Sequence, residues 1–178
     1  MRFEHLIEIN DPLNPLAEIL SREQVWSGLM HRVDEPTLFL PGLDRCVILS
    51  RAGGQIEREL YFGTARIRDT VTLQDHEWVR FESAANAEHA GGKLIIRLEE
   101  PEAMRLYLRF TYETTLPEGM APGDVMQVSG FVKAAYRESD VDTVRIIRMI
   151  ATTGRPQEGP RKALRAVYSG KKGDIHDH

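Results

Sequence analysis

Residues 124–153 read DVMQVSGFVKAAYRESDVDTVRIIRMIATT, a stretch without proline that predicts one amphipathic helix of about eight turns. Asp124 is placed to act as the N-cap with Gln127 three residues on, and Gly154 and Pro156 are residue types that end helices. At about 1.5 Å per residue the helix would be about 45 Å long, enough to cross a small domain. It must therefore lie across another layer of structure.

One face of this predicted helix is apolar. A turn of about 100° per residue places on it Val125, Val128, Val132, Ala135, Tyr136, Ser139, Thr143, Ile146, Ile147 and Ile150. Charged residues, among them Lys133, Arg137 and Arg145, fall on the other face. The hydroxyls of Ser139 and Thr143 lie at the centre of the apolar face. They either bond back to a carbonyl one turn earlier or line a cavity.

The chain before this helix alternates apolar and polar residues with period two, which predicts strands that are half-buried on one face. Seven such runs are found, at residues 2–9, 43–51, 55–62, 65–73, 78–83, 93–99 and 104–113. Short turns separate several of them, including Gly53-Gly54, Gly63-Thr64 and Gly91-Gly92. Short separations favour hairpins, so we expect an antiparallel meander.

Two short helices are expected between the first and second strands. Ser21 can cap the first, with Gln24 at its third position and an apolar stripe that ends before Pro36. A second short turn, Thr37 to Leu40, closes at Pro41. The predicted fold class is α+β, a curved seven-stranded antiparallel sheet wrapped around one long C-terminal helix, with a natural pocket between sheet and helix.

The amino-acid composition of the chain is that of an ordinary globular protein. Its 178 residues are 42% hydrophobic and 28% charged, which suits one globular domain, and the net charge of −4 argues against general nucleic-acid binding. A single cysteine, Cys46, excludes an internal disulfide. No apolar run is long enough to span a bilayer, and the first residues do not resemble a signal peptide, so a soluble cytoplasmic protein is expected.

The character of the chain changes after the long helix. Residues 155–178 are rich in glycine, proline and basic residues. We expect a domain at residues 1–153 and a basic, partly ordered tail at residues 154–178, with an RNA-binding or membrane-surface arm as the alternative for the tail.

One hairpin predicts a buried ion pair. If Gly63-Thr64 forms a two-residue type II′ turn, then Phe62 faces Ala65, and Arg58 faces Asp69 on the apolar, concave side of the sheet. A lone buried charge is costly, so each needs the other. The pair is either a structural salt bridge that fixes the hairpin register or the polar spot of a cavity.

Other candidates for chemistry are weaker. His5 falls on the inward side of the first strand and could serve as a base, although a histidine among apolar residues is more often a core residue with one hydrogen bond. The remaining histidines show no metal-ligand spacing, so no metal site is predicted. No nucleophile motif and no phosphate-binding loop is recognised, and no cofactor is expected.

Several segments resemble a known family. They are Phe3-Glu4-His5, Asn10-Asp11-Pro12, Leu13-Asn14-Pro15, Arg22-Glu23-Gln24-Val25-Trp26 and Arg58-Glu59-Leu60-Tyr61-Phe62-Gly63. Together with the order of elements, they are similar to the AtaL-like branch of the START-like, or SRPBCC, superfamily of helix-grip proteins, over residues 1–153. This superfamily includes pollen allergens and polyketide cyclases. The resemblance implies an apolar cavity under the long helix without naming its ligand.

Three functions then compete. The first is binding of an apolar or aromatic small molecule, lipid-like or polyketide-like; the second is a cyclase or aromatase without metal or nucleotide cofactor; the third is a scaffold with a filled cavity. A carboxylate held ionised by Arg58 is a poor general base, which ranks binding above catalysis. The predicted ligand-binding residues are Arg58, Asp69, Phe110, Tyr112, Val132, Tyr136, Ser139 and Thr143.

Overall fold

A computed structural model describes residues 1–85, 91–114 and 124–153, with side chains of the last segment from residue 133 onward. Seven strands form one antiparallel sheet in the order β1-β7-β6-β5-β4-β3-β2. The strands are β1 Arg2–Glu8, β2 Arg45–Ala52, β3 Gln55–Phe62, β4 Ala65–Gln74, β5 Trp78–Ser83, β6 Gly92–Glu102 and β7 Arg105–Thr114. The helices are α1 Arg22–Asp34 and α2 Asp124–Thr153. The predicted tail, residues 154–178, lies outside the described residues.

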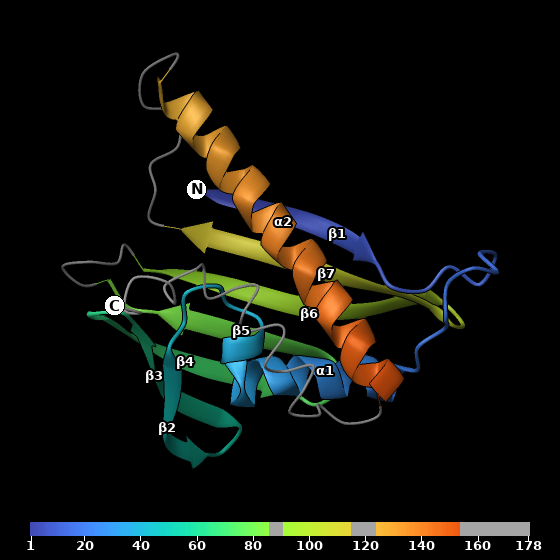
Figure 1. The fold of residues 1–178 in the computed structure, drawn as a ribbon, viewed down its shortest axis with the longest axis horizontal. Coiled ribbons are helices and arrows are strands. Elements are labelled where there is room, and N and C mark those ends of the chain that lie inside the picture. The colour runs from blue at the N-terminus through green and yellow to red at the C-terminus, as the bar shows by residue number, and fades with distance from the viewer. Residues whose placement is uncertain (86–90, 115–123, 154–178) are drawn as a thin grey trace, which may run out of the picture.

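Both helices lie on one side of the sheet. Figure 1 shows α2 running obliquely across β1, β7 and β6, with α1 beside its C-terminal half. The predicted α+β helix-grip arrangement, a curved sheet around one long C-terminal helix, is confirmed. No helix within the described ranges combines the length and apolar character needed to cross a bilayer.

The prediction of two helices after the first strand is wrong, because only α1 is an α-helix. The second expected helix is a three-residue 3₁₀ turn, Pro36–Leu38. Pro36 and Pro41 leave too short an interval for a second helical turn, since proline lacks the N–H that a helix interior needs and disfavours helical geometry in the residue before it.

The start of α1 is the predicted capping box. Ser21 Oγ accepts from the backbone N–H of Gln24 at 3.1 Å, and Gln24 Oε1 accepts from the backbone N–H of Ser21 at 2.8 Å. Two of the N–H groups that a helix leaves without internal partners are thereby satisfied. The capped helix buries Val25, Trp26 and Leu29 against the sheet.

The β3–β4 hairpin has the predicted register. Phe62 pairs with Ala65, Leu60 with Ile67 and Arg58 with Asp69. Gly63 has φ of 58°, and Thr64 is not among the described residues with positive φ, as a type II′ turn requires. The turn therefore sets which side chains of both strands face the helices.

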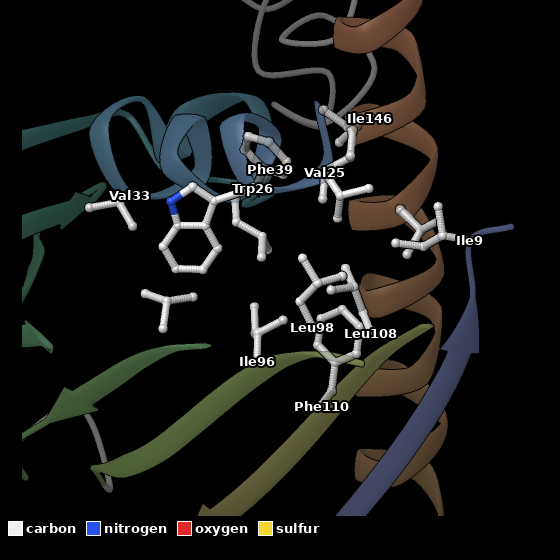
Figure 2. Close-up of a cluster of buried hydrophobic side chains, with 14 of the residues drawn as sticks. Ile9, Val25, Trp26, Val33, Phe39, Ile96, Leu98, Leu108, Phe110 and Ile146 are labelled. Carbon is white, nitrogen blue, oxygen red and sulfur yellow. The ribbon is translucent and has the colours of Figure 1, made fainter. Parts of the chain in front are cut away.

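The hydrophobic core lies between the sheet, α1 and the C-terminal half of α2 (Figure 2). Ile146 and Ile147 of α2 are fully buried there, and so are Ile96 and Leu108 of the sheet. The two helices touch closely at Gly28, where an added Cβ would lie 2.8 Å from Ile147 side-chain carbons. The glycine permits this approach.

The middle of α2 is turned differently from the predicted face. Ala135, expected on the apolar face, is exposed, whereas Asp140 and Val144 are buried. Tyr136, Asp140 and Thr143 follow the helical spacing of three and four residues, so the stripe that faces the sheet includes a carboxylate. Sequence reasoning had left this carboxylate off the apolar face.

Candidate functional site

A pocket of about 300 Å³ lies between the concave face of the sheet, the C-terminal end of α1 and the middle of α2. Ligand-binding cavities begin at about this size. Apolar side chains from β3 to β7 form much of its wall, including Leu60, Ile67 and Phe81. Its lining residues with polar or charged side chains are Arg32, Asp69, Ser83, Lys93, Tyr112, Thr114, Tyr136 and Ser139.

The predicted pair of Arg58 and Asp69 is present and buried. Arg58 Nε donates to one oxygen of Asp69 at 2.8 Å, and Nη2 donates to the other at 2.5 Å. Arg58 is 1% exposed and Asp69 6% exposed. Because both carboxylate oxygens are engaged in parallel bonds, the pair is a bidentate, charge-assisted one.

The third arm of the Arg58 guanidinium ties the sheet to α1. Its Nη1 donates to the backbone carbonyl of Val33 at 2.8 Å, and the carbonyl of Arg32 lies at 3.4 Å. These carbonyls belong to the last turn of α1, where a helix has unsatisfied acceptors and favours a positive charge. Arg58 thus joins β3, β4 and α1, and it lies behind Asp69 and outside the pocket wall. This geometry supports the structural interpretation of the pair.

A second buried polar pair links the sheet to α2. The Tyr112 hydroxyl of β7 donates to Asp140 Oδ1, and the other Asp140 oxygen is buried without a hydrogen-bond partner in the described part of the chain. Burial raises the pKa of Asp140 to about 7, against the opposing effects of the Tyr112 hydrogen bond and the Arg32 charge. Burial, followed by the charge of Asp140, also raises the pKa of Tyr112. The pair can therefore hold or release a proton near neutral pH.

Arg32 is a buried cation on the pocket wall. It is 6% exposed, and its guanidinium carbon lies 4.8 Å from the centre of the Phe81 ring, which is a cation–π contact. Its Nε is buried without an acceptor among the described residues. Burial lowers its pKa, yet an arginine begins so high on the pH scale that the group stays charged near neutral pH.

Aromatic rings close the pocket on the β1 side. Tyr112 stacks on Phe3 with ring centres 5.0 Å apart, and the Tyr136 ring centre lies 4.3 Å from that of Tyr112. His5 approaches Tyr112 edge-on at 6.2 Å. Burial, then the charges of Arg137 and Lys133, lower the His5 pKa, so the imidazole is neutral near pH 7. His5 lies outside the pocket wall, and its Nε2 has no hydrogen-bond partner among described residues.

The structure brings together four of the eight predicted ligand-binding residues at the pocket wall: Asp69, Tyr112, Tyr136 and Ser139. Arg58 lies behind Asp69, and Phe110 is fully buried in the core. The Thr143 hydroxyl donates to the carbonyl of Ser139 at 3.1 Å, which is the backbone bond expected of a helical threonine. Thr143 is not among the residues that line the pocket, and the Val132 side chain lies outside the described residues.

Sequence reasoning missed Arg32 and Asp140, although a signal for each was present. Arg32 lies seven residues after Val25 and three after Leu29, on the buried stripe of α1. Asp140 lies four residues after Tyr136, on the stripe of α2 that faces the sheet. A charged residue at a stripe position of an otherwise amphipathic helix predicts a buried polar site.

A curved antiparallel sheet that encloses a pocket with a long C-terminal helix defines the helix-grip class of proteins. Within this class, the chain belongs to the AtaL family, described as acetylaranotin biosynthesis cluster protein L, whose sequence pattern matches residues 7–154. No curated protein sequence matches the chain.

Solved structures share the fold at low sequence identity. The di-domain ARO/CYC StfQ from the steffimycin biosynthetic pathway has a TM-score of 0.63 and 13% identity, over 85% of this chain and 50% of StfQ, so the chain spans half of that protein's length. The Zhui aromatase/cyclase from Streptomyces sp. R1128 has a TM-score of 0.55 and 14% identity, over 85% of this chain and 93% of its own. Ara h 8.0201 has a TM-score of 0.55 and 10% identity, over 86% and 98%. The three confirm the helix-grip fold.

Proposed function

We propose that the protein binds an apolar or aromatic small molecule, lipid-like or polyketide-like, in the pocket between the sheet and α2. The observation that carries the proposal is the pocket itself, about 300 Å³ under the middle of α2, with apolar walls and a few convergent polar groups. Sites of this composition hold small molecules by burial and orient them by the polar groups. Tyr112, Tyr136 and Ser139 are the predicted orienting residues.

Native mass spectrometry of freshly purified protein, compared with the same sample denatured, tests the proposal. A discrete mass excess that disappears on denaturation is expected, and its exact mass would identify the retained molecule. Absence of any excess, together with absence of uptake of a neutral apolar probe such as N-phenyl-1-naphthylamine, would contradict the proposal and support a scaffold whose cavity takes no ligand.

The buried Tyr112–Asp140 pair favours a second candidate function, a cyclase or aromatase. A carboxyl with a pKa of about 7 can pass a proton in either direction at neutral pH, and the Tyr112 side chain that bonds to it lines the pocket. Two structural neighbours are named as aromatase/cyclases, at 13% and 14% identity. The pocket would then fold a poly-β-ketone chain for ring closure.

Incubation with a synthetic poly-β-ketone surrogate, followed by mass spectrometry of the products, tests this candidate. Dehydrative ring closure removes one water, so the product mass falls by that of water. Turnover that Asp140→Asn abolishes while the surrogate still binds would support catalysis. Binding without turnover in the wild type would leave the protein a binding module.

A further inference from the structure

The charged residues on the pocket wall differ in whether they have an ion-pair partner among the described residues. Of the wall residues with formal charges, Asp69 is paired with Arg58, and Lys93 lies 3.7 Å from Glu82 and 3.5 Å from Glu113. Arg32 donates no hydrogen bond and forms no ion pair with any described residue, and its Nε is buried without an acceptor. It is therefore the unpaired cation of the described wall.

Nearby groups do not supply the missing counter-ion. Both oxygens of Asp69 already receive Arg58 donors. Asp140 accepts from Tyr112; its charge acts on that of Arg32 from nearby, but no hydrogen bond or close ion pair joins the two side chains among the described residues. Burial also raises the pKa of Asp140 to about 7, so about half of this carboxyl is neutral near pH 7.

Burying an unpaired guanidinium is strongly unfavourable unless something else provides acceptors. The guanidinium of Arg32 lies over the face of Phe81, which compensates only part of that cost. Its fork of N–H groups matches the two oxygens of a carboxylate and also suits the single oxygen of a phenolate or enolate. The opening in front of it is the pocket.

We infer that the ligand carries one anionic oxygen group, a carboxylate or an acidic phenol or enol, and that Arg32 binds this group while the apolar walls hold the rest of the molecule. The inference rests on the proposed function and adds the chemical class of the ligand. It also assigns specificity to a residue of α1, whereas the sequence offered Arg58 and Asp69 as one of two alternatives, a structural salt bridge or the polar spot of the cavity.

Two fluorescent probes with the same aromatic skeleton test the charge requirement. 1-Anilinonaphthalene-8-sulfonate carries an anion, whereas N-phenyl-1-naphthylamine is the same molecule without it. Arg32→Met removes the cation and keeps much of the side-chain length. Arg68→Met makes the same chemical change on the outer face of β4, where the side chain is 70% exposed, and serves as the matched control.

Arg32→Met should weaken binding of the anionic probe by about tenfold or more, as expected for loss of a charge-assisted contact, and change binding of the neutral probe by less than about threefold. Arg68→Met should bind both probes like the wild type. Equal changes for the two probes, or no change for either, would overturn the anion inference while leaving the proposed function intact. If the wild type takes up neither probe, the proposed function fails, and the inference fails with it.

A second measurement needs no variant and decides the matter if Arg32→Met does not fold. In the wild type, 2-naphthoate should displace N-phenyl-1-naphthylamine at a concentration at least about tenfold lower than the uncharged 2-naphthylmethanol does. Equal potency of the two competitors would contradict a role of the cation in ligand choice.

Discussion

The middle and the C-terminal half of α2 face the same sheet but meet it in different ways. In the C-terminal half, Ile146 and Ile147 are fully buried, and Ile147 packs directly on Gly28 of α1. In the middle, Tyr136 and Ser139 border a pocket of about 300 Å³. One helix thus supplies both a close packing contact and part of the pocket wall. Stability should depend mainly on the first region and ligand binding on the second.

The two buried arginines repeat this contrast. Arg58 has acceptors on all three nitrogens, in β4 and at the end of α1. Arg32 is next to Val33, whose carbonyl accepts from Arg58. The Arg32 side chain itself donates to no acceptor among the described residues. Both guanidinium carbons lie near the same Phe81 ring, at 5.2 Å and 4.8 Å. Arg58 therefore belongs to the framework, and Arg32 is left for the proposed ligand.

The largest predicted loss of stability is at the framework arginine. Arg58→Ala should lower the free energy of unfolding by about 3 kcal/mol or more. It leaves Asp69 buried without its partner, and it removes the donor to the Val33 carbonyl at the C-terminal end of α1. Urea unfolding measures the change. Arg68→Ala on the exposed face of the same hairpin should cost less than about 1 kcal/mol. Equal unfolding midpoints for Arg58→Ala and the wild type would contradict the framework role.

A pH-dependent effect is predicted at Asp140, on the boundary between the two regions. Its pKa is raised from 3.8 to about 7, so between these values the folded protein holds a proton that the unfolded chain has released. The wild type therefore loses stability from this group as pH rises from about 4 to about 7. Asp140→Asn stays neutral and can still accept from Tyr112. It should gain up to about 4 kcal/mol relative to the wild type across that window.

Urea unfolding at several pH values checks this prediction. The control is Asp142→Asn, two residues along α2, where the side chain is 33% exposed and pairs with Arg145 at 3.3 Å. Because this control removes a carboxylate from a partly exposed position of the same helix, it should change the free energy of unfolding by less than about 1 kcal/mol. A constant difference between Asp140→Asn and the wild type from pH 4 to 8 would show that folding does not raise the pKa of this carboxyl.

Gly28→Ala tests the packed region. The added methyl would lie 2.8 Å from Ile147 carbons, so a helix must shift. Overpacking of this kind costs about 1–3 kcal/mol, partly offset by the better helix propensity of alanine. Ser27→Ala, on the exposed face of α1, isolates the propensity gain. If Gly28→Ala and Ser27→Ala unfold at the same temperature, the two helices are not in close contact at Gly28.

The smallest effect on stability is predicted in the pocket region. Ser139→Leu adds a larger apolar side chain where the structure has open space, so the free energy of unfolding should change by less than about 1 kcal/mol. A loss of more than about 2 kcal/mol in thermal or urea unfolding would mean that this part of α2 is packed as tightly as the part around Ile147.

Much of the fold followed from local signals in the sequence. Period-two alternation predicted seven strands, and the turn at Gly63 predicted the partner of Arg58 correctly, because a two-residue hairpin leaves one register. The expected helix at residues 37–40 was wrong because a few apolar residues between two prolines resemble a helix start without room for one.

The site was harder to predict. Arg32 and Asp140 are charged, and charged residues on a helix are assigned by default to its solvent face. Their burial depends on how α1 and α2 are rotated against the sheet, which is set by contacts such as that of Gly28 with Ile147. Thr143 and Phe110 were placed on the correct face, but that face is divided between core and pocket by tertiary packing.

The central claim is that the space under the middle of α2 takes up an apolar molecule. The most direct measurement is a titration of N-phenyl-1-naphthylamine into the wild type and Ser139→Leu, followed by fluorescence. Saturable binding of one probe molecule per wild-type chain, lost or strongly weakened in the folded Ser139→Leu variant, is the predicted result. Absence of binding to the wild type, or equal binding to both proteins, would contradict the claim.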